Sequence, residues 1–391
     1  MVHVSPLWIN RKQTFPRLKE NINADILVIG GGISGVSAAY HLAHKRKRVV
    51  LIEKNLIASG TTGRGTGILE PGFEMDFVDM VKIYGLRLAN KFWRTTMKSL
   101  QEIKTVIKRH KIACDLENTG SIMFASQEKE IPLLKKDALL RIRNHHSSKL
   151  YLHEDVGKIV NANVPAIMFS SIEAIFNQEK FVVGLARHCA KYMQVYEETP
   201  ALSIYKTQGG YRVKTPHGII STHAIILTAY ASGMKFLKSK HALSHDICYE
   251  IATKPLTKEQ LRSISWRKGH CIWPLGRSYD YIRLTKDKRL IVGGEDSEIA
   301  LNKQRSEKHF RRLQNFLIRV FPQLYDIEID YKWTGTIYLR KRDFPELGQK
   351  GNIFYSFAQG GHGLLTGFYG GHLLAHLALG KLDKDFRVLT G

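Results

Sequence analysis

The sequence predicts an α/β fold with two interleaved parts, a Rossmann-like parallel sheet and a mixed sheet of α+β character. A glycine-rich turn joins a short apolar strand to a helix near the start of the chain. A second glycine cluster joins a strand to a helix near its end. Between them, short strands and helices follow one another without an internal repeat or a low-complexity linker. This order of elements favours two domains whose segments alternate along the chain over two domains that follow one another.

The first glycine-rich turn has the spacing and the setting of a dinucleotide-binding fingerprint. Its parts are a strand over 26–29, the glycines Gly30, Gly32 and Gly35, a helix over 36–44, and a second strand over 49–52 that ends at Glu53. The first glycine permits the tight turn, the second lets the backbone approach a pyrophosphate, and the third lets the helix pack on the strand. The helix N-terminus supplies N–H groups to phosphates, and the acid can accept hydrogen bonds from ribose hydroxyls. We therefore predict a nucleotide site here.

The later elements follow from apolar spacing. Helices are expected over 78–110, where apolar residues recur three and four apart, and over 181–193, which has one apolar face. Further helices are expected over 128–144, which is strongly charged, over 307–321, which has a basic face, and over roughly 367–379. Short apolar or alternating runs predict strands over 120–125, 195–196, 201–206, 211–215, 223–227, 248–253, 279–285, 289–293 and 352–358.

Length and charge limit the functional classes. The 391 residues suffice for two domains with real cores, and 43% hydrophobic with 24% charged residues is ordinary for a globular protein. The net charge of +24 indicates either a lysine-rich solvated surface or attraction to nucleic acid, an anionic membrane or an acidic partner. The basic stretches 45–48 and 104–111 lack interleaved aromatic residues. Nucleic-acid binding is therefore possible but has no motif behind it.

Cysteine usage and hydropathy bear on the compartment. The four cysteines are far apart and share no metal-ligand spacing, so we predict free buried thiols in a reducing compartment and no metal site. Residues 1–23 lack the apolar core of a secretory signal. The most apolar stretch, 363–380, is interrupted by His372 and His376. We expect a cytoplasmic protein without a membrane span.

Six motifs in order resemble the FAD-dependent amine and amino-acid oxidoreductases of the D-amino-acid oxidase superfamily, and more closely its glycine oxidase, sarcosine oxidase and gamma-glutamylputrescine oxidase branch. They are the fingerprint at 30–35, the loop 59–67, and the segments 249–256, 281–294, 333–348 and 352–367. The resemblance runs over about 8–386. It implies an FAD-binding Rossmann-like domain formed by 20–80, 150–235 and 330–391, interleaved with a mixed-sheet substrate domain formed by 81–149 and 236–329.

The resemblance also implies which residues bind FAD. These are Gly30, Gly32, Ile33, Ser34, Gly35, Glu53, Lys54, Ser59, Gly60, Thr61, Arg64, Thr66, Gly67, Ile68, Val195, Thr228, Ala229, Trp333, Gly361, His362, Gly363 and Leu364. Hydroxyls and one guanidinium in the loop 59–67 can wrap the pyrophosphate and ribityl chain, and that guanidinium can pair with phosphate or with a flavin oxygen. N–H groups of the turn 360–363 would face the flavin edge where negative charge develops.

Two departures from the family pattern stand out in this chain. Gly65 replaces the usual Asn, and Ile68 replaces a Gly. The segment 336–342 lacks the cysteine, and Gly63 with Arg64 lacks the histidine, that anchor FAD covalently in some relatives. We therefore predict FAD bound without a covalent link.

The reaction that the resemblance implies is oxidation of a C–N bond in a small amine or amino acid to an imine, with molecular oxygen reoxidising the flavin. Arg283 and Arg340 are candidates for orienting a substrate carboxylate, Tyr249 for capping the pocket, and His362 for a hydrogen bond to the flavin. Each has a plainer alternative: surface charges for the arginines, core packing for Tyr249, and an ordinary turn for His362. Two rival functions remain open at this stage, a flavin-dependent RNA-modifying enzyme and an FAD-binding scaffold without catalysis.

Overall fold

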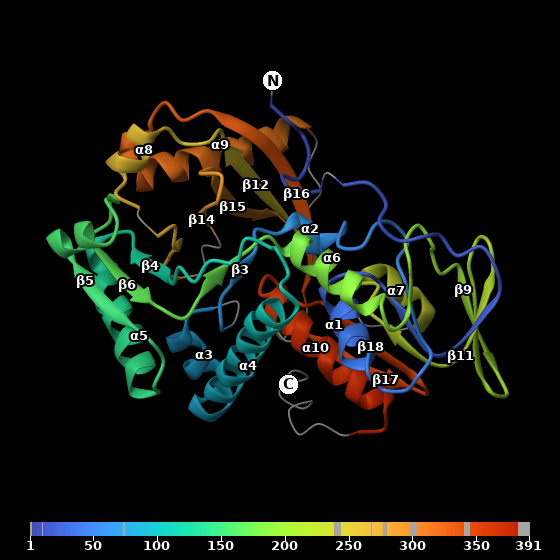
Figure 1. The fold of residues 1–391 in the computed structure, drawn as a ribbon. Coiled ribbons are helices and arrows are strands. Elements are labelled where there is room, and N and C mark those ends of the chain that lie inside the picture. The colour runs from blue at the N-terminus through green and yellow to red at the C-terminus, as the bar shows by residue number, and fades with distance from the viewer. Residues whose placement is uncertain are drawn as a thin grey trace.

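The computed structural model describes residues 2–9, 11–72, 75–237, 244–266, 268–276, 280–297, 303–339 and 345–381. Two eight-stranded sheets and one two-stranded sheet make up its β-structure. Figure 1 shows the first sheet with its helices on one side of the molecule and the second sheet on the other. The mixed α/β architecture predicted from the sequence is confirmed.

The first sheet has the strand order β17-β18-β11-β1-β2-β8, with β10 and β9 continuing from β11 as antiparallel strands. Five consecutive strands of this order, from β18 to β8, are parallel neighbours and are rich in buried Val, Ile and Leu, as expected for a sheet covered on both faces. The strands are β1 (Ile22–Ile29), β2 (Val49–Ile52), β8 (Gln194–Tyr196), β9 (Ser203–Thr207), β10 (Gly210–Lys214), β11 (Ile219–Leu227), β17 (Glu346–Lys350) and β18 (Ile353–Phe357).

Three helices pack together beside this sheet. They are α1 (Ile33–Leu42), α6 (Gln178–Cys189) and α10 (Gly363–Ala378). Helix α1 lies against both of the others, and α10 also contacts β18. The built Cβ of Gly371 would overlap the backbone of α1 at Ser34, so glycine at this position permits the close α1–α10 contact.

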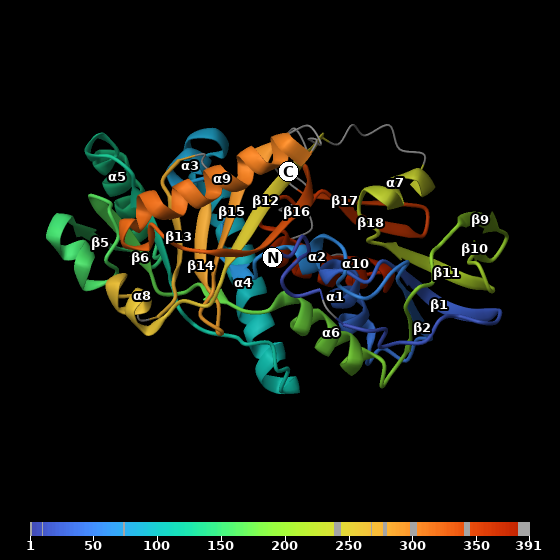
Figure 2. The same cartoon turned by 90° about the horizontal axis from the view of Figure 1, so that it is seen from above.

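The second sheet has the order β16-β12-β15-β14-β13-β4-β6-β5 and is antiparallel except between β13 and β4. One of its faces is covered by α9 (Lys303–Val320), which packs on β12 and β15. The strands are β4 (Ser121–Ala125), β5 (Lys149–Leu152), β6 (Ala166–Ser170), β12 (Ser244–Thr253), β13 (Cys271–Pro274), β14 (Tyr281–Leu284), β15 (Leu290–Ser297) and β16 (Ile329–Leu339). Figure 2 shows β12, β14 and β15 side by side next to α9.

The remaining elements connect and flank the two large sheets. The helices are α2 (Thr61–Arg64), α3 (Phe77–Tyr84), α4 (Leu86–His110), α5 (Ile131–Arg143), α7 (Ala231–Leu237) and α8 (Lys258–Ser263), and the small sheet pairs β3 (Ile68–Leu69) with β7 (Ala174–Ile175). One long helix was predicted over 78–110, but the structure has α3 and α4. Gly85 separates them with φ of +77°, a conformation that breaks a helix and favours glycine.

Three strands of the second sheet lie in ranges that the resemblance assigned to the FAD-binding domain. They are β5, β6 and β16. The chain thus passes back and forth between the sheets, and the exact domain boundaries stay a prediction.

The described parts of the N-terminal segment, residues 2–9 and 11–15, contact both large sheets. The amide of His3 donates to Asp330 O at 2.8 Å and its carbonyl accepts from Lys332 N at 2.9 Å, beside β16. The guanidinium of Arg283 lies 5.1 Å from the ring centre of Trp8. Arg11 then pairs with Glu197 beyond β8. In Figure 2 the start of the chain lies near the middle of the molecule, between the two sheets.

Within the described ranges, none of the helices combines the length and the apolar character needed to cross a membrane.

Candidate functional site

A cavity of about 780 Å³ lies between the two large sheets, within the usual range for ligand pockets. One part is lined at the carboxyl ends of β1, β2 and β11, where open α/β sheets bind ligands. The opposite part is lined by residues of β12, β13, β14 and β15. The cavity therefore joins a nucleotide-type edge to a wall of side chains.

The glycine turn after β1 is built by close backbone approach. Gly30 has φ of +114°, and a Cβ there would stand 2.7 Å from the carbonyl carbon of Thr228. A Cβ on Gly35 would overlap the carbonyl oxygen of Gly30. The Thr228 hydroxyl donates to the carbonyls of Ile29 and Gly30 at 3.2 and 3.3 Å. Side chains at these glycines would push the helix and two strands apart, so the spacing is a steric requirement.

Glu53 lies at the end of β2 and lines the cavity. One carboxylate oxygen accepts from Gly31 N at 2.7 Å, and the other accepts from Asn55 N at 2.9 Å. Burial raises the pKa of this carboxyl, and the two backbone hydrogen bonds oppose the shift. Each oxygen retains a lone pair that can accept from a ribose hydroxyl.

Two helices begin at the cavity without a cap from their own N-cap side chain. The N-cap residues are Gly32 for α1, which has no side chain, and His362 for α10, whose side chain does not bond the first turn. In α1 the Ile33 amide donates to the Thr62 hydroxyl at 3.1 Å, and the amides that follow it remain available. Both N-caps line the cavity. Uncapped helix N-termini offer N–H groups and partial positive charge to anionic groups. Together with the close-approach glycines, these features fit a dinucleotide with a pyrophosphate.

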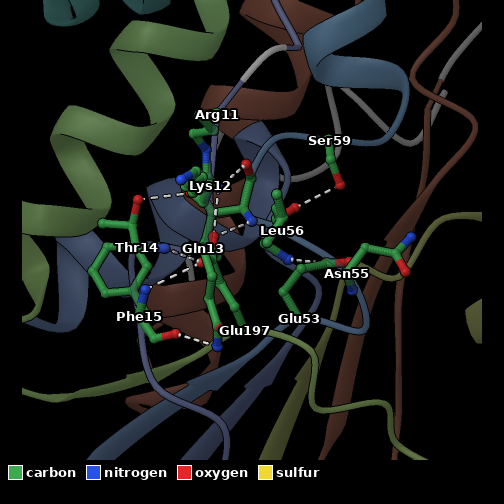
Figure 3. A network of polar contacts seen from close by, with 12 residues as sticks. Arg11, Lys12, Gln13, Thr14, Phe15, Glu53, Asn55, Leu56, Ser59 and Glu197 are labelled. Carbon is green, nitrogen blue, oxygen red and sulfur yellow. Dashed lines mark hydrogen bonds and ion pairs between the residues drawn. The ribbon is translucent and has the colours of Figure 1, made fainter.

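Glu197 organises the segment next to this edge (Figure 3). Its buried carboxylate accepts hydrogen bonds from Thr14 N, Phe15 N and Ile57 N at 2.6 to 3.1 Å and pairs with Arg11. Burial alone would raise its pKa, but these donors hold the pKa below the usual range. Glu197 thereby ties the N-terminal segment to the turn that follows Glu53.

The loop 59–68 is held from behind by the second sheet. Arg64 donates to Thr334 O at 3.1 Å, and the Trp333 indole donates to Arg64 O at 2.8 Å. Arg283 is buried, donates to Gly67 O at 3.0 Å and Phe176 O at 2.9 Å, and also bonds Thr66 O. Burial lowers the Arg283 pKa to about 10. These bonds shape the loop from the side away from the cavity.

The structure brings most of the residues expected to bind FAD to one cavity. Those that line it are Gly30, Gly32, Ile33, Ser34, Glu53, Lys54, Gly60, Thr61, Arg64, Thr66, Gly67, Ile68, Thr228, Ala229, Gly361, His362, Gly363 and Leu364. The other four lie outside its lining. Gly35 packs against Gly30 and Trp333 supports Arg64, as described above, while the Ser59 hydroxyl donates to Leu56 O and Val195 is buried in the core.

The residues expected to act on substrate are dispersed. His362 lines the cavity, with its Nε2 3.5 Å from a carboxylate oxygen of Glu70. Tyr249 is buried behind the wall and stacks on His309 with ring centres 4.5 Å apart. Arg283 is engaged by the carbonyls named above. Arg340 lies outside the described residues.

The wall presents side chains that sequence reasoning missed. Glu250, Asp296, Tyr281 and Trp273 line the cavity from four different strands. Glu250 is the immediate neighbour of Tyr249, and successive residues of a strand face opposite sides of the sheet. Strand alternation was the available signal: the buried aromatic ring faces α9, and the acid faces the cavity.

The chain belongs to the FAD-dependent oxidoreductase family known as DAO, whose family model matches residues 25–377. It is therefore an FAD-dependent oxidoreductase and a flavoprotein, as the resemblance predicted. The glycine edge and the two helix N-termini at the cavity are the parts of the structure that fit this cofactor.

Curated relatives cover nearly the whole chain. Gamma-glutamylputrescine oxidoreductase of Escherichia coli is 27% identical over 96% of this chain and 88% of that protein. Glycine oxidase of Bacillus licheniformis is 25% identical over 92% of this chain and 94% of that protein. Among solved structures, glycine oxidase from Geobacillus kaustophilus matches with a TM-score of 0.81 at 16% identity, over 94% of this chain and 98% of that one. This last match shows a shared fold.

Proposed function

We propose that this enzyme oxidises the C–N bond of a small amine to an imine, and that its preferred substrate carries positive charge. The family and the names of its relatives, which include an amine and an amino-acid oxidoreductase, support the reaction class. One observation supports the charge preference: a buried carboxylate of the wall, Glu250, faces the cavity without a hydrogen-bond partner for one oxygen in the described structure.

Glu250 has the setting of a group that receives a proton or a cation. Its residue is 4% exposed on β12. Burial and the nearby charge of Asp296 raise its pKa well above the usual range, and Arg64 acts in the opposite direction. A buried carboxylate with an unsatisfied oxygen is costly unless a ligand supplies a donor. An ammonium group supplies both a donor and a compensating charge.

Three further acidic side chains line the cavity, one from the wall and two from the segment between β3 and α3. Besides Glu250, the carboxylates of Glu70, Asp76 and Asp296 line the cavity. Arg141 also lines it, but its guanidinium bonds Asp137 at 2.6 Å and lies 4.9 Å from the ring centre of Trp93. Among the described residues, the other lining cations are Lys54 and Lys235, which lie beside the first sheet, and Arg64, which bonds β16 of the second sheet and opposes the raised pKa of Glu250. The wall therefore favours a cationic amine over a carboxylate-bearing substrate.

FAD, when bound, accepts a hydride equivalent from the carbon next to the substrate nitrogen. That transfer requires a neutral amine, because its lone pair forms the C=N bond as the C–H bond breaks. Glu250 accepts the proton that the ammonium group releases and so prepares the substrate. Trp273 and Tyr281 supply flat surfaces beside the same cavity. Water then hydrolyses the imine to a carbonyl compound and an amine.

We further propose an electron acceptor, a mode of FAD binding and a cellular compartment. The electron acceptor is molecular oxygen, which reoxidises the cofactor and yields hydrogen peroxide. FAD is bound without a covalent link: the cavity-lining thiol of Cys271 has its pKa raised well above the usual range by burial, which disfavours the reactive thiolate. The protein works in the cytoplasm, which its four free, buried cysteines support.

The test is an anaerobic screen of amines and amino acids that follows the loss of oxidised-flavin absorbance. We expect diamines and other dicationic amines to reduce the flavin faster than glycine or sarcosine. Glu250→Gln should slow reduction by about 100-fold with FAD content unchanged. Glu259→Gln, on the exposed face of α8, is the matched control and should behave as the wild type.

The pH dependence gives a second readout. Because the pKa of Glu250 is raised, its acid form persists above the usual glutamate range, and reduction should accelerate as pH rises through that pKa. Glu250→Gln should remove this limb of the profile. Faster reduction by carboxylate substrates, or an unaltered profile in the variant, would contradict the proposal. Binding that weakens steeply with salt, without any reduction by amines, would instead favour the nucleic-acid alternative.

A further inference from the structure

A cluster of metal-ligating side chains lies away from the cavity, where three helices meet. His41 is at the end of α1, Glu102 is in the middle of α4, and His372 is in the second half of α10. One ligand atom from each lies within 4.8 Å of the other two. Glu102 Oε1 is 2.8 Å from His41 Nε2 and 3.9 Å from His372 Nδ1. Nothing in the proposed reaction uses these residues.

The hydrogen bonds of His41 orient its ring toward a cation. Its Nδ1 lies 2.7 Å from the carbonyl oxygen of Ser37, which can only accept, so Nδ1 carries the hydrogen. The other ring nitrogen, Nε2, faces a carboxylate oxygen of Glu102 at 2.8 Å. This contact is favourable when a positive charge lies there, either a second ring proton or a bound metal ion. A ring hydrogen donated to a backbone carbonyl is also the usual arrangement for a metal-binding histidine.

A fourth ligand is available one helical turn further along α10. His376 follows His372 by four residues, which places both on one face of the helix. Their ring centres are 4.3 Å apart, and those of His372 and His41 are 4.4 Å apart. Two histidines four residues apart on a helix form a common half of a zinc site. His376 is not among the residues whose ligand atoms lie within 4.8 Å of one another, so its side chain must rotate before three imidazoles and one carboxylate form a four-ligand set.

The cluster is partly accessible, so an ion can enter from solvent. The side chains of His41, His372 and Glu102 are 10%, 20% and 30% exposed. Glu102 places a carboxylate donor among imidazole rings, and this combination of oxygen and nitrogen donors is one that a divalent transition metal accepts.

We propose that His41, Glu102 and His372, with His376 as the fourth ligand, bind one divalent transition-metal ion of the zinc class. The nitrogen-rich donor set suits Zn²⁺, Ni²⁺, Co²⁺ or Cu²⁺, whereas Mg²⁺ and Ca²⁺ prefer oxygen ligands. The bound ion joins α1, α4 and α10. This site goes beyond the proposed function and does not depend on it.

The role of the ion is structural. Helices α1 and α10 both begin at the cavity, and His41 and His372 lie about eight and nine residues further on, roughly 12–14 Å along each helix at 1.5 Å per residue, with His376 further still. The ion is therefore too far from the helix starts to act on substrate there. It fixes the two helices to each other behind the site and should stabilise the FAD-loaded protein.

The experiment uses the full-length, FAD-loaded protein without a histidine tag, stripped with a chelator and then titrated with Zn²⁺ alone. Calorimetry and elemental analysis give affinity and stoichiometry. We expect about one ion per chain and a higher melting temperature when it is bound. His372→Asn and Glu102→Gln should each weaken binding by about tenfold or more.

His44→Asn is the matched control, because it removes an exposed histidine just beyond the same end of α1. It should bind Zn²⁺ as the wild type does and show the same rise in melting temperature. Glu102→Gln preserves the size of the half-buried side chain. This variant therefore tests Zn²⁺ binding even if His372→Asn does not fold. No Zn²⁺ binding by the wild type, or equal binding by the ligand variants, would overturn the proposal.

Discussion

The two ends of the cavity are built by different means. At the nucleotide edge, backbone groups approach so closely that Gly30 and Gly35 cannot carry a side chain. At the opposite wall, Glu250, Tyr281 and Trp273 reach in from three separate strands. An edge made of backbone depends on steric fit, whereas a wall made of side chains can change its chemistry without moving the sheet. The two ends should therefore respond differently to substitution.

The largest effect is expected from Gly35→Ala. Its Cβ would overlap the Gly30 carbonyl oxygen, so α1 must move away from β1. We expect the free energy of FAD binding to become less favourable by about 3 kcal/mol or more. This corresponds to FAD binding at least about 100-fold weaker. Flavin absorbance relative to protein absorbance measures it. Gly157→Ala, where a Cβ meets open space, is the control. Full FAD content in Gly35→Ala would show that the edge tolerates side chains after all.

Glu197→Gln tests whether the nucleotide edge also depends on charge. The variant leaves Arg11 and three backbone amides around a weaker acceptor. We expect unfolding free energy to fall by about 2–3 kcal/mol at neutral pH. Because the native pKa is lowered, this stabilisation is present above the unfolded-state pKa and is lost as pH falls through the native one. The unfolding free energies of the wild type and the variant should therefore become equal at acidic pH.

The neighbouring exposed pair is the control for that measurement. Glu198 bonds Arg17 at 2.6 Å, with side chains 36% and 52% exposed. Glu198→Gln should change the unfolding free energy by less than about 1 kcal/mol in denaturant titrations. Equal losses in the two variants would remove the distinction between the buried and the surface carboxylate.

Arg283→Lys separates the two roles considered for this arginine. The structure engages it with the loop carbonyls, so the shorter ammonium group should loosen the loop and weaken FAD binding by about tenfold. Substrate KM measured with saturating FAD should stay unchanged. A raised KM for carboxylate substrates with normal FAD affinity would instead restore the role predicted from sequence.

The smallest effect is expected from Trp333→Phe. The substitution removes the indole donor to Arg64 O but keeps an aromatic ring in the core. We expect a loss of about 1 kcal/mol in stability and a change in FAD affinity well below tenfold. Thermal unfolding and FAD titration measure both quantities. A large loss of FAD would mean that Trp333 contributes more than the support of one loop carbonyl.

The same contrast explains what the sequence could predict. The nucleotide-binding motif can be recognised in the sequence because tight backbone geometry requires glycine at fixed spacing, here at Gly30, Gly32 and Gly35. The strands β1 and β2 and the cofactor follow from that pattern. Glu250 was missed because its role depends on which sheet face meets the cavity, and this is set by the packing of α9 against Tyr249 and its neighbours. Nothing local in the sequence encodes that contact.

The histidine cluster shows the same limit. His372 and His376 were visible as interruptions of an apolar helix, but their partners come from α1 and α4. Sequence spacing relates ligands within one helix and cannot relate three helices. The break between α3 and α4, by contrast, had a local signal in the sequence, Gly85. It was missed because the apolar spacing on both sides of this glycine is that of one continuous helix.

The path of the N-terminal segment has a consequence for the order of folding. His3 pairs with the strand that contains Tyr331, and Arg11 anchors to Glu197. A ribosome must synthesise about half of the polypeptide before Glu197 exists and most of it before Tyr331 does. Docking of the earliest residues is thus among the last events in maturation, and a nascent chain must keep Trp8 and its neighbours from engaging elsewhere until then.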